Sequence, residues 1–335
     1  SGFVLDFRKK SNIVFIVDEA SMISNANTGS EVFGSGRLLD DLLQYVYNND
    51  ACKLILVGDP AQLPPVGTNL SPALDKNYLA SLGFKTYTSE LTEVVRQADE
   101  SGILANATML RDYIYQDKCS EIPNLNINKY PDIIRISGSE LINEIESSYS
   151  RCGIEETRII TRSNYFANRY NQGIRSQILW REDEISIGDI LMITKNNYSN
   201  LGNDAPVDFI ANGDIVEVKR VGSTQEIFGY RFVDLLVVFQ DYPEFELDIK
   251  VVLESLTVSG ASMPEDYYKT IYNELAIDYE HISDSRKRHE AILDDSFFNA
   301  LQVKFAYAIT CHKSQGGQWK TVFIDHGVLQ NAVID

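Results

Sequence analysis

Two neighbouring carboxylates, Asp18 and Glu19, follow an apolar run over residues 13–17. The run has no polar alternation, which is typical of a strand covered on both faces inside a parallel sheet. In open α/β sheets, ligands bind at the carboxyl ends of the strands. Because side chains alternate along a strand, the two carboxylates suit two tasks: one holds Mg²⁺, and the other activates an attacking water. Taken alone, an acidic pair at a strand end is more often an ordinary polar loop.

A second apolar run, residues 53–57, leads into a loop that contains Asp59 and Gln62. The intervening residues 37–48 have a broad apolar face and predict a helix. Strand, helix and strand in this order predict a right-handed crossover with parallel pairing. Such a unit would bring Asp18 and Asp59 to one edge of the sheet.

A third polar group follows an apolar run near the end of the chain. A helix is expected to begin there, and backbone N–H groups at a helix start bind anions. Gly316 and Gly317 permit close approach of the backbone. A solvated helix cap is the simpler interpretation of these residues. The group supplies hydroxyl, imidazole, ammonium and amide side chains: Thr310, His312, Lys313, Ser314 and Gln315.

Composition restricts the classes of protein. The 335 residues suffice for two or three domains, and 44% hydrophobic with 23% charged residues is ordinary for a globular protein. The four cysteines form no CxxC pair and predict free thiols, with neither a disulfide framework nor a zinc site. No signal peptide or membrane span is recognisable, so a cytoplasmic protein is expected. A net charge of −18 argues against nucleic acid unless positive charge is confined to a groove.

The pattern of elements predicts an α/β fold with an inserted β-rich module. Turns are expected at 212–213 and 221–223, and the module is expected to form a small barrel. Helices are predicted over 37–48, up to about 115, over 137–150 and 163–179, and within 263–295. Strands are predicted over 13–17, 53–57, 84–87, 133–136, 157–161, 190–194, 215–221, 230–239, 246–253, 303–310 and 321–325.

Four segments together resemble motifs II, III, IV and V of superfamily 1 helicases. They most resemble the 5′-to-3′ branch of RecD-like and Dda-like enzymes, the type of the exodeoxyribonuclease V alpha subunit. The resemblance covers nearly the whole chain and includes IANGDIVEV (210–218). The segments are VFIVDEAS (14–21), LVGDPAQLPPVG (56–67), LTEVVRQ (91–97) and FAYAITCHKSQGGQW (305–319).

This resemblance implies two RecA-like parallel-sheet domains, with an SH3-like barrel inserted in the second. Residues 1–95 would be the first domain, and 96–183 the first part of the second. Residues 184–300 would be the inserted module with a helical extension, and 301–335 the end of the second domain.

The resemblance also implies ATP and Mg²⁺ as cofactors. Asp18 resembles the metal-associated carboxylate, Glu19 the catalytic base and Gln62 a γ-phosphate sensor. Arg96 resembles an arginine finger that reaches the γ-phosphate from the domain interface. Gln62 as a loop amide and Arg96 as a surface arginine are the plainer interpretations. The residues implied to bind the cofactors are Asp18, Asp59, Gln62, Arg96 and Gly316.

The motif V resemblance implies contact with single-stranded DNA. Thr310, His312, Lys313, Ser314 and Gln315 would contact the strand backbone and couple it to the nucleotide. Aromatic side chains stack on bases in helicases of this kind, and Trp319 and Tyr165 could serve. Aromatic residues near strand ends are, however, more often part of a core.

The sequence departs from the pattern at both ends. It contains no G-x-x-x-x-G-K-[ST] phosphate loop and stops before an arginine-bearing motif VI. We therefore expect a fragment of an ATP-dependent, 5′-to-3′ helicase or translocase of bacterial or phage origin. The parent would act as a monomer on single-stranded DNA, with nuclease or replication and repair proteins as partners.

Two other functions remain open. A non-catalytic single-strand or partner-binding module of a recombination or repair complex agrees with the acidic charge and the missing loop. A phosphate loop ~60–100 residues before Asp18 would favour the helicase instead. A subunit of an ATP-dependent nuclease is the other alternative. No carboxylate cluster of nuclease type is visible beyond Asp18, Glu19 and Asp59, so nuclease activity would belong to a partner.

We expect these 335 residues alone to have no meaningful ATPase activity, because the lysine and amides of a phosphate loop are missing. The measurement is steady-state ATP turnover with single-stranded DNA and Mg²⁺. A turnover rate normal for a helicase would contradict the expectation.

Overall fold

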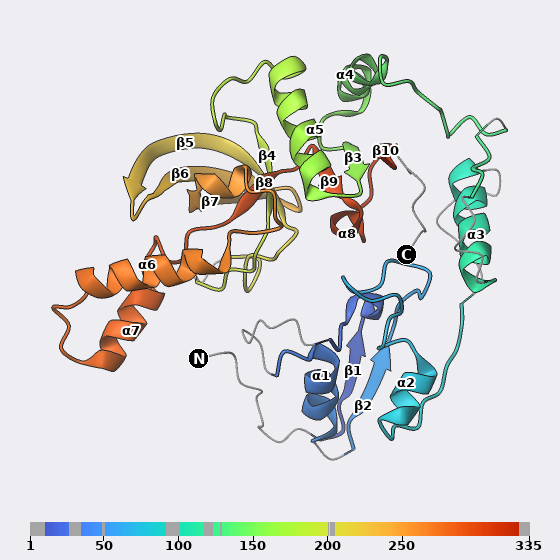
Figure 1. Cartoon of the computed structure of the whole chain (residues 1–335), viewed down its shortest axis with the longest axis horizontal. Helices are drawn as coiled ribbons and strands as arrows, with labels where there is room; N and C mark the ends of the chain where they lie inside the picture. Colours follow the sequence, from blue (N-terminus) through green and yellow to red (C-terminus); the bar gives the residue numbers. More distant parts are fainter. Residues whose placement is uncertain are drawn as a thin grey trace. The chain divides into compact units, whose positions relative to one another are not determined.

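The computed structural model describes residues 11–26, 35–48, 51–91, 101–116, 123–127, 129–199, 201 and 205–327 (Figure 1). Two compact units divide the chain. Unit 1 comprises Ser1–Arg135 with Gln330–Asp335, and unit 2 comprises Ile136–Leu329.

Unit 1 contains the two strands that were predicted to lead into acidic loops. Strands β1 (Val14–Val17) and β2 (Lys53–Leu56) pair in parallel, with Val17 opposite Leu56. Helix α1 spans Leu38–Tyr47 and buries Leu39, Leu43 and Val46. The remaining elements are η1 (Ala20–Met22), α2 (Lys76–Ser81) and α3 (Gly102–Tyr115).

The strand β1 was expected to be covered on both faces, and the structure differs. Val17 and Leu56 pack against a core that includes Leu39 of α1. On the other face, Val14 and Ile16 are 52% and 68% exposed. Within the described residues, one face of β1 is therefore exposed. An apolar run without polar alternation does not by itself establish that a strand is covered on both faces.

Unit 2 contains a three-stranded parallel sheet in the order β10-β3-β9. Its strands are β3 (Thr157–Thr161), β9 (Ala308–Thr310) and β10 (Thr321–Asp325). Helices α4 (Leu141–Cys152) and α5 (Asn164–Gln177) contact β3. The Ser163 hydroxyl accepts a hydrogen bond from the Phe166 amide at 3.4 Å, which confirms the predicted N-cap.

The β-rich module is an antiparallel sheet in the order β7-β6-β5-β4-β8. One bridge, between Val251 and Leu301, links its two edges, but no closed barrel is found among the described strands. The expected barrel is therefore not shown, and the bridge is the contact that joins the edges of the sheet. Its strands are β4 (Ile190–Ile193), β5 (Ile215–Ile227), β6 (Tyr230–Phe239), β7 (Tyr242–Val252) and β8 (Val303–Phe305).

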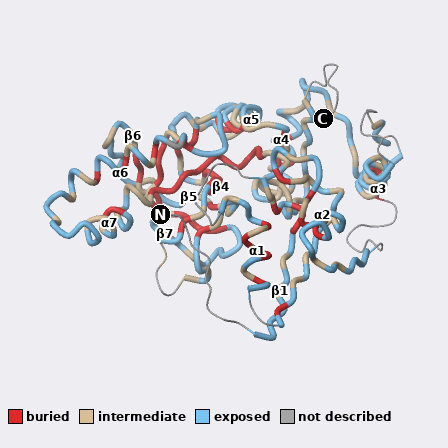
Figure 2. The backbone as a smooth tube through the Cα atoms, turned by 60° about the horizontal axis from the view of Figure 1, so that its bottom comes forward, coloured by how far each residue is buried: buried red, intermediate tan, exposed pale blue. Residues whose placement is uncertain are grey.

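A second core supports the far end of this sheet. Phe232 and Val252 pack with Tyr267 and Ile271 of helix α6 (Glu265–Asp278). The turn η2 (Leu253–Leu256) and helix α7 (Ser285–Leu293) complete the helical extension. Buried residues concentrate along the strands of unit 2, while much of the surface of α6 and α7 is exposed (Figure 2).

Three local predictions were wrong. Residues 84–87 and 133–136 are irregular rather than strands. The expected turn at 221–223 lies inside β5, where the register with β6 shifts between Val221 and Thr224. An extra residue in one strand bends it without ending it, and this pattern resembles a turn in sequence.

Among the described residues, no helix has the length and apolar character needed to cross a membrane.

The run 303–310 was expected to be one strand and is two. β8 belongs to the antiparallel sheet and β9 to the parallel sheet, with Ala306 and Tyr307 between them. The Asn171 side chain donates to the Phe305 carbonyl at 2.8 Å and accepts from the Ala308 amide at 2.7 Å. A side chain of α5 thus supplies the hydrogen bonds that a continuous ladder would have made.

We expect Asn171→Leu to lower the free energy of unfolding by about 2 kcal/mol or more, because each buried polar group left without a partner costs about 1–3 kcal/mol. Urea titration measures the change. The exposed neighbour variant Gln172→Leu is the control and should stay within about 0.5 kcal/mol of wild type. Equal effects of the two substitutions would contradict the role assigned to Asn171.

Candidate functional site

The parallel pairing of β1 and β2 brings both predicted acidic loops to one edge of the sheet in unit 1. The Val57 amide donates to the Val17 carbonyl at 2.9 Å, and the Ala20 amide donates to the Val57 carbonyl at 2.8 Å. The ladder therefore continues past the ends of both strands. Asp18 and Asp59 follow this shared end, as the sequence predicted.

The two neighbouring carboxylates are positioned by a turn and not by the pleat of a strand. Glu19 has a φ of 51°, in the left-handed region, and its amide donates to Asp18 Oδ1 at 2.9 Å. A residue with a Cβ pays about 1–2 kcal/mol for this conformation. Asp18 and Glu19 are both exposed, so both carboxylates are accessible to a ligand.

Gly58 lies where the two acidic loops approach each other closely. A Cβ at this position would lie 3.0 Å from the Ser21 amide nitrogen and 3.0 Å from Leu74 Cδ1. A larger residue here would force Leu74 and the segment that follows Glu19 to shift, so glycine suits this close approach of the Asp59 loop. Ser21 is fully buried beneath this contact.

Asp59 has a partner that the sequence did not reveal. Arg111 of α3 places Nη2 2.5 Å from Asp59 Oδ2, and the Ala61 amide donates to Asp59 Oδ1 at 2.9 Å. The carboxylate is thereby neutralised and fixed within its own loop. No motif marks Arg111, which lies 52 residues further along the chain. Only the position of α3 identifies it.

Gln62 lies in the same loop as Asp59. Its backbone amide donates to the Asp59 carbonyl at 3.0 Å and closes a turn, while the residue itself is exposed. Arg96, the predicted arginine finger, lies outside the described residues. The roles predicted for Glu19, Gln62 and Arg96 therefore stay predictions.

The acidic edge suits Mg²⁺ only together with a phosphate. No group of three or more His, Cys, Asp or Glu side chains that could hold a metal occurs in the described residues. Mg²⁺ usually keeps several waters and binds through one or two carboxylates plus phosphate oxygens. The accessible oxygens of Asp18 and Glu19 fit that mode of binding.

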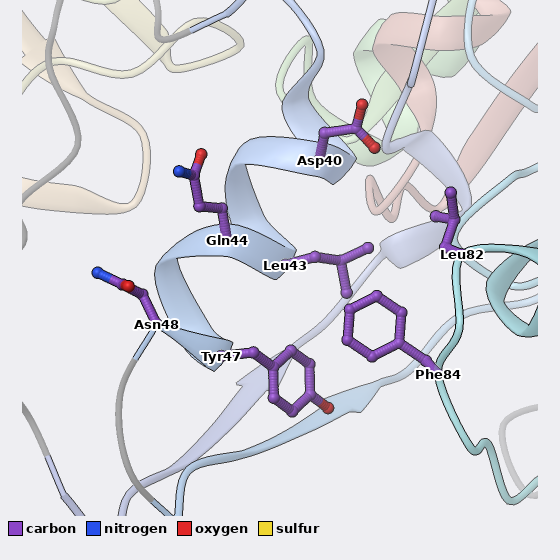
Figure 3. A pocket seen from close by; sticks show the side chains of 7 residues that line it. All are labelled: Asp40, Leu43, Gln44, Tyr47, Asn48, Leu82 and Phe84. Atoms are coloured by element: carbon purple, nitrogen blue, oxygen red, sulfur yellow. The ribbon is translucent and has the colours of Figure 1, made fainter.

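Two surface hollows of the described residues contain none of the residues predicted to bind nucleotide, metal or the strand backbone, although the second contains Tyr165. In unit 1, α1 and the segment after α2 form one hollow, in which Tyr47 and Phe84 face each other with ring centroids 4.9 Å apart (Figure 3). In unit 2, the second hollow lies beside α5 and is lined by Tyr165, Arg169 and Phe305, among others. The residues predicted to act on the nucleotide, Asp18, Glu19 and Gln62, are instead exposed in loops.

The predicted single-strand contacts lie on and around α8 (Cys311–Ser314) in unit 2. A helix of one turn is too short for the anion site expected at its start. The Ser314 hydroxyl donates to the Cys311 carbonyl at 2.8 Å, and so serves the turn itself. Thr310 makes no side-chain cap, and His312 is exposed.

Lys313 is the cation of this group, and it connects α8 to the β-rich module. Its Nζ donates to Asn212 Oδ1 in the Asn-Gly turn before β5. Partial burial lowers the pKa of the Lys313 amine. Gln315 ends the helix and is half-buried, and Gly316 follows with a φ of 78°.

Trp319 was a candidate stacking platform and belongs instead to the packing below α8. Its ring packs against the main core and lies 5.6 Å from the Arg158 guanidinium. A Cβ on Gly317 would meet the ring at 2.1 Å, so a glycine is required there. Tyr165 is 57% exposed and lies edge-on to Phe166 at 5.4 Å.

Comparison with known proteins finds a family match near the end of this sequence. Residues 305–333 match the model of the UvrD-like helicase C-terminal domain. This segment includes all the predicted motif V residues and β10.

Similarity extends along most of the chain at low identity. "Uncharacterized protein R530" of Acanthamoeba polyphaga mimivirus is 23% identical over 369 residues, which cover 94% of this chain and 68% of that protein. A solved structure titled "Structural Basis for DNA Unwinding at Forked dsDNA by two coordinating Pif1 helicases" shares 14% identity with a TM-score of 0.43. The alignment covers 93% of this chain and 62% of that one.

We expect Gly58→Ala to destabilise the acidic edge by about 1–3 kcal/mol, as overpacking does at a close contact. Hydrogen exchange of the Ala20 amide, which donates to Val57, should become faster. The control is Gly138→Ala, because a Cβ there meets nothing within 4 Å. Unchanged exchange in Gly58→Ala would disprove the close approach.

Proposed function

We propose that the protein to which these residues belong is an ATP-dependent DNA helicase or translocase of superfamily 1, in the RecD-like and Dda-like branch. The proposal is carried by one observation: the segment that matches the helicase C-terminal domain contains the complete predicted motif V. The shared acidic edge of β1 and β2 agrees with it. ATP, Mg²⁺ and single-stranded DNA are the proposed ligands, and 5′-to-3′ the proposed direction.

The acidic edge would serve NTP hydrolysis. Asp18 would hold Mg²⁺, which neutralises charge on the phosphates when bound. Glu19 would orient and deprotonate the attacking water, and exposed Gln62 would contact the γ-phosphate. Arg111 fixes Asp59 and through it the Gln62 turn, so we assign Arg111 a positioning role.

The α8 region would serve the nucleic acid. Lys313 would contact a strand phosphate, with Thr310, His312, Ser314 and Gln315 beside it. Because the chain carries a net charge of −18, a single well-placed cation should account for a large share of the salt dependence.

A non-catalytic single-strand or partner-binding module is the second candidate. It is favoured by the ion pair between Arg111 and Asp59, which removes one of the carboxylates predicted to face the nucleotide. The helicase and the single-strand-binding module both place single-stranded nucleic acid at α8. Mg²⁺-dependent ATP binding at Asp18 and Glu19 would separate them, since only the helicase requires it.

We expect Lys313→Ala to weaken binding of oligo-dT and to reduce the slope of log K against log salt by about 0.7, the value for one phosphate contact to a single strand. Fluorescence anisotropy across a salt series measures both quantities. Lys320→Ala is the matched control: this lysine is exposed and pairs with Glu156 at 3.6 Å. An unchanged affinity and slope in Lys313→Ala would argue against the motif V assignment.

A further inference from the structure

A pair of aromatic side chains stands at the surface of the β-rich module. Tyr198 and Phe209 have ring centroids 5.1 Å apart with planes inclined at 30°. They are 49% and 37% exposed, respectively. Exposed rings held in mutual contact present an apolar surface to a ligand.

The backbone beneath the rings is fixed. Asn197 and Ile210 exchange two hydrogen bonds of 2.9 Å each, in an isolated antiparallel bridge. Tyr198 directly follows Asn197 and Phe209 directly precedes Ile210, so both residues lie on the loop side of this bridge. The pairing of the rings is thus set by a β-type contact, not by chance approach of two surface side chains.

A chain of hydrogen bonds connects this pair to the proposed strand-binding cation. Lys313 donates to the side chain of Asn212, and the Asn212 amide donates to Asn196 Oδ1 at 2.7 Å. Asn196 Nδ2 in turn donates to the Tyr198 hydroxyl at 3.0 Å. Four residues thus form one polar path from α8 to the aromatic pair, which passes through the backbone N–H of Asn212.

From this arrangement we infer that Tyr198 and Phe209 form a base-stacking site for the single strand whose backbone contacts Lys313. The inference rests on the function proposed above. A strand with a phosphate at Lys313 would carry a neighbouring base toward the rings. Asn196 and Asn212 lie along the hydrogen-bonded path between this cation and the rings.

Charge favours stacking as the source of affinity. The net charge of −18 opposes a path along the module that relies on phosphate contacts alone. Stacking on an aromatic face does not depend on positive charge, and it tolerates any base because every base has a π-face. The proposed site is therefore selective for single strands with bases and not for a base sequence.

The experiment compares oligo-dT with an abasic oligonucleotide of equal length, using the full 335-residue chain. Wild type should bind oligo-dT about tenfold more tightly, which corresponds to about 1.4 kcal/mol. Tyr198→Leu and Phe209→Leu keep apolar bulk but lose the ring. Each should remove most of the preference for oligo-dT and leave abasic binding and the salt slope unchanged.

Two further variants make the outcomes distinct. Tyr242→Leu removes an exposed tyrosine of the same sheet and should behave as wild type. Lys313→Ala should weaken binding of both oligonucleotides. If wild type binds both strands equally while Lys313→Ala still weakens them, the stacking site is wrong and the proposed function stands.

Other results also decide the matter. Equal weakening of oligo-dT and abasic binding in the two ring variants would overturn the stacking site, since it would indicate a structural role. If wild type binds neither strand at low salt, both the stacking site and the proposed single-strand function are overturned.

Discussion

The buried carboxylate of Asp189 is the interaction on which the architecture of unit 2 depends. It is fully buried and accepts from Arg175 at 3.1 Å, from Arg181 at 2.6 Å and from the Tyr307 hydroxyl at 2.8 Å. Removing one partner from such a group is costly, because a buried charge is left without compensation. These contacts join α5, the start of β4 and the crossing between β8 and β9.

That crossing determines where α8 lies. The chain leaves the antiparallel sheet at Phe305 and enters the parallel sheet at Ala308, with Asn171 bonding the backbone between them. β9 then delivers Thr310 and Lys313 to the carboxyl end of the parallel sheet. The same crossing holds the β-rich module beside α8, so that Asn212 can meet Lys313. The positions of α8 and of the β-rich module are therefore set by one junction.

Unit 1 depends on a different constraint, the absence of a side chain at Gly58. The close approach to Ser21 lets two parallel strands end in loops that share one edge. The left-handed turn at Glu19 then exposes neighbouring carboxylates, at a conformational cost that the core beneath must offset.

The sequence by itself determined the parallel pairing of β1 with β2, the helix cap at Ser163 and the β-rich character of the module, because these follow from local apolar patterns and turn chemistry. It also singled out residues 310–315, which lie within the segment that matches the model of the UvrD-like helicase C-terminal domain. Only the tertiary structure decided that the run 303–310 divides between two sheets, that the edges of the module meet at a bridge between Val251 and Leu301, and that Asp59 pairs with Arg111. Those features depend on contacts between residues far apart in the chain. A buried run has the same apolar sequence pattern whether it forms one strand or is divided between two sheets.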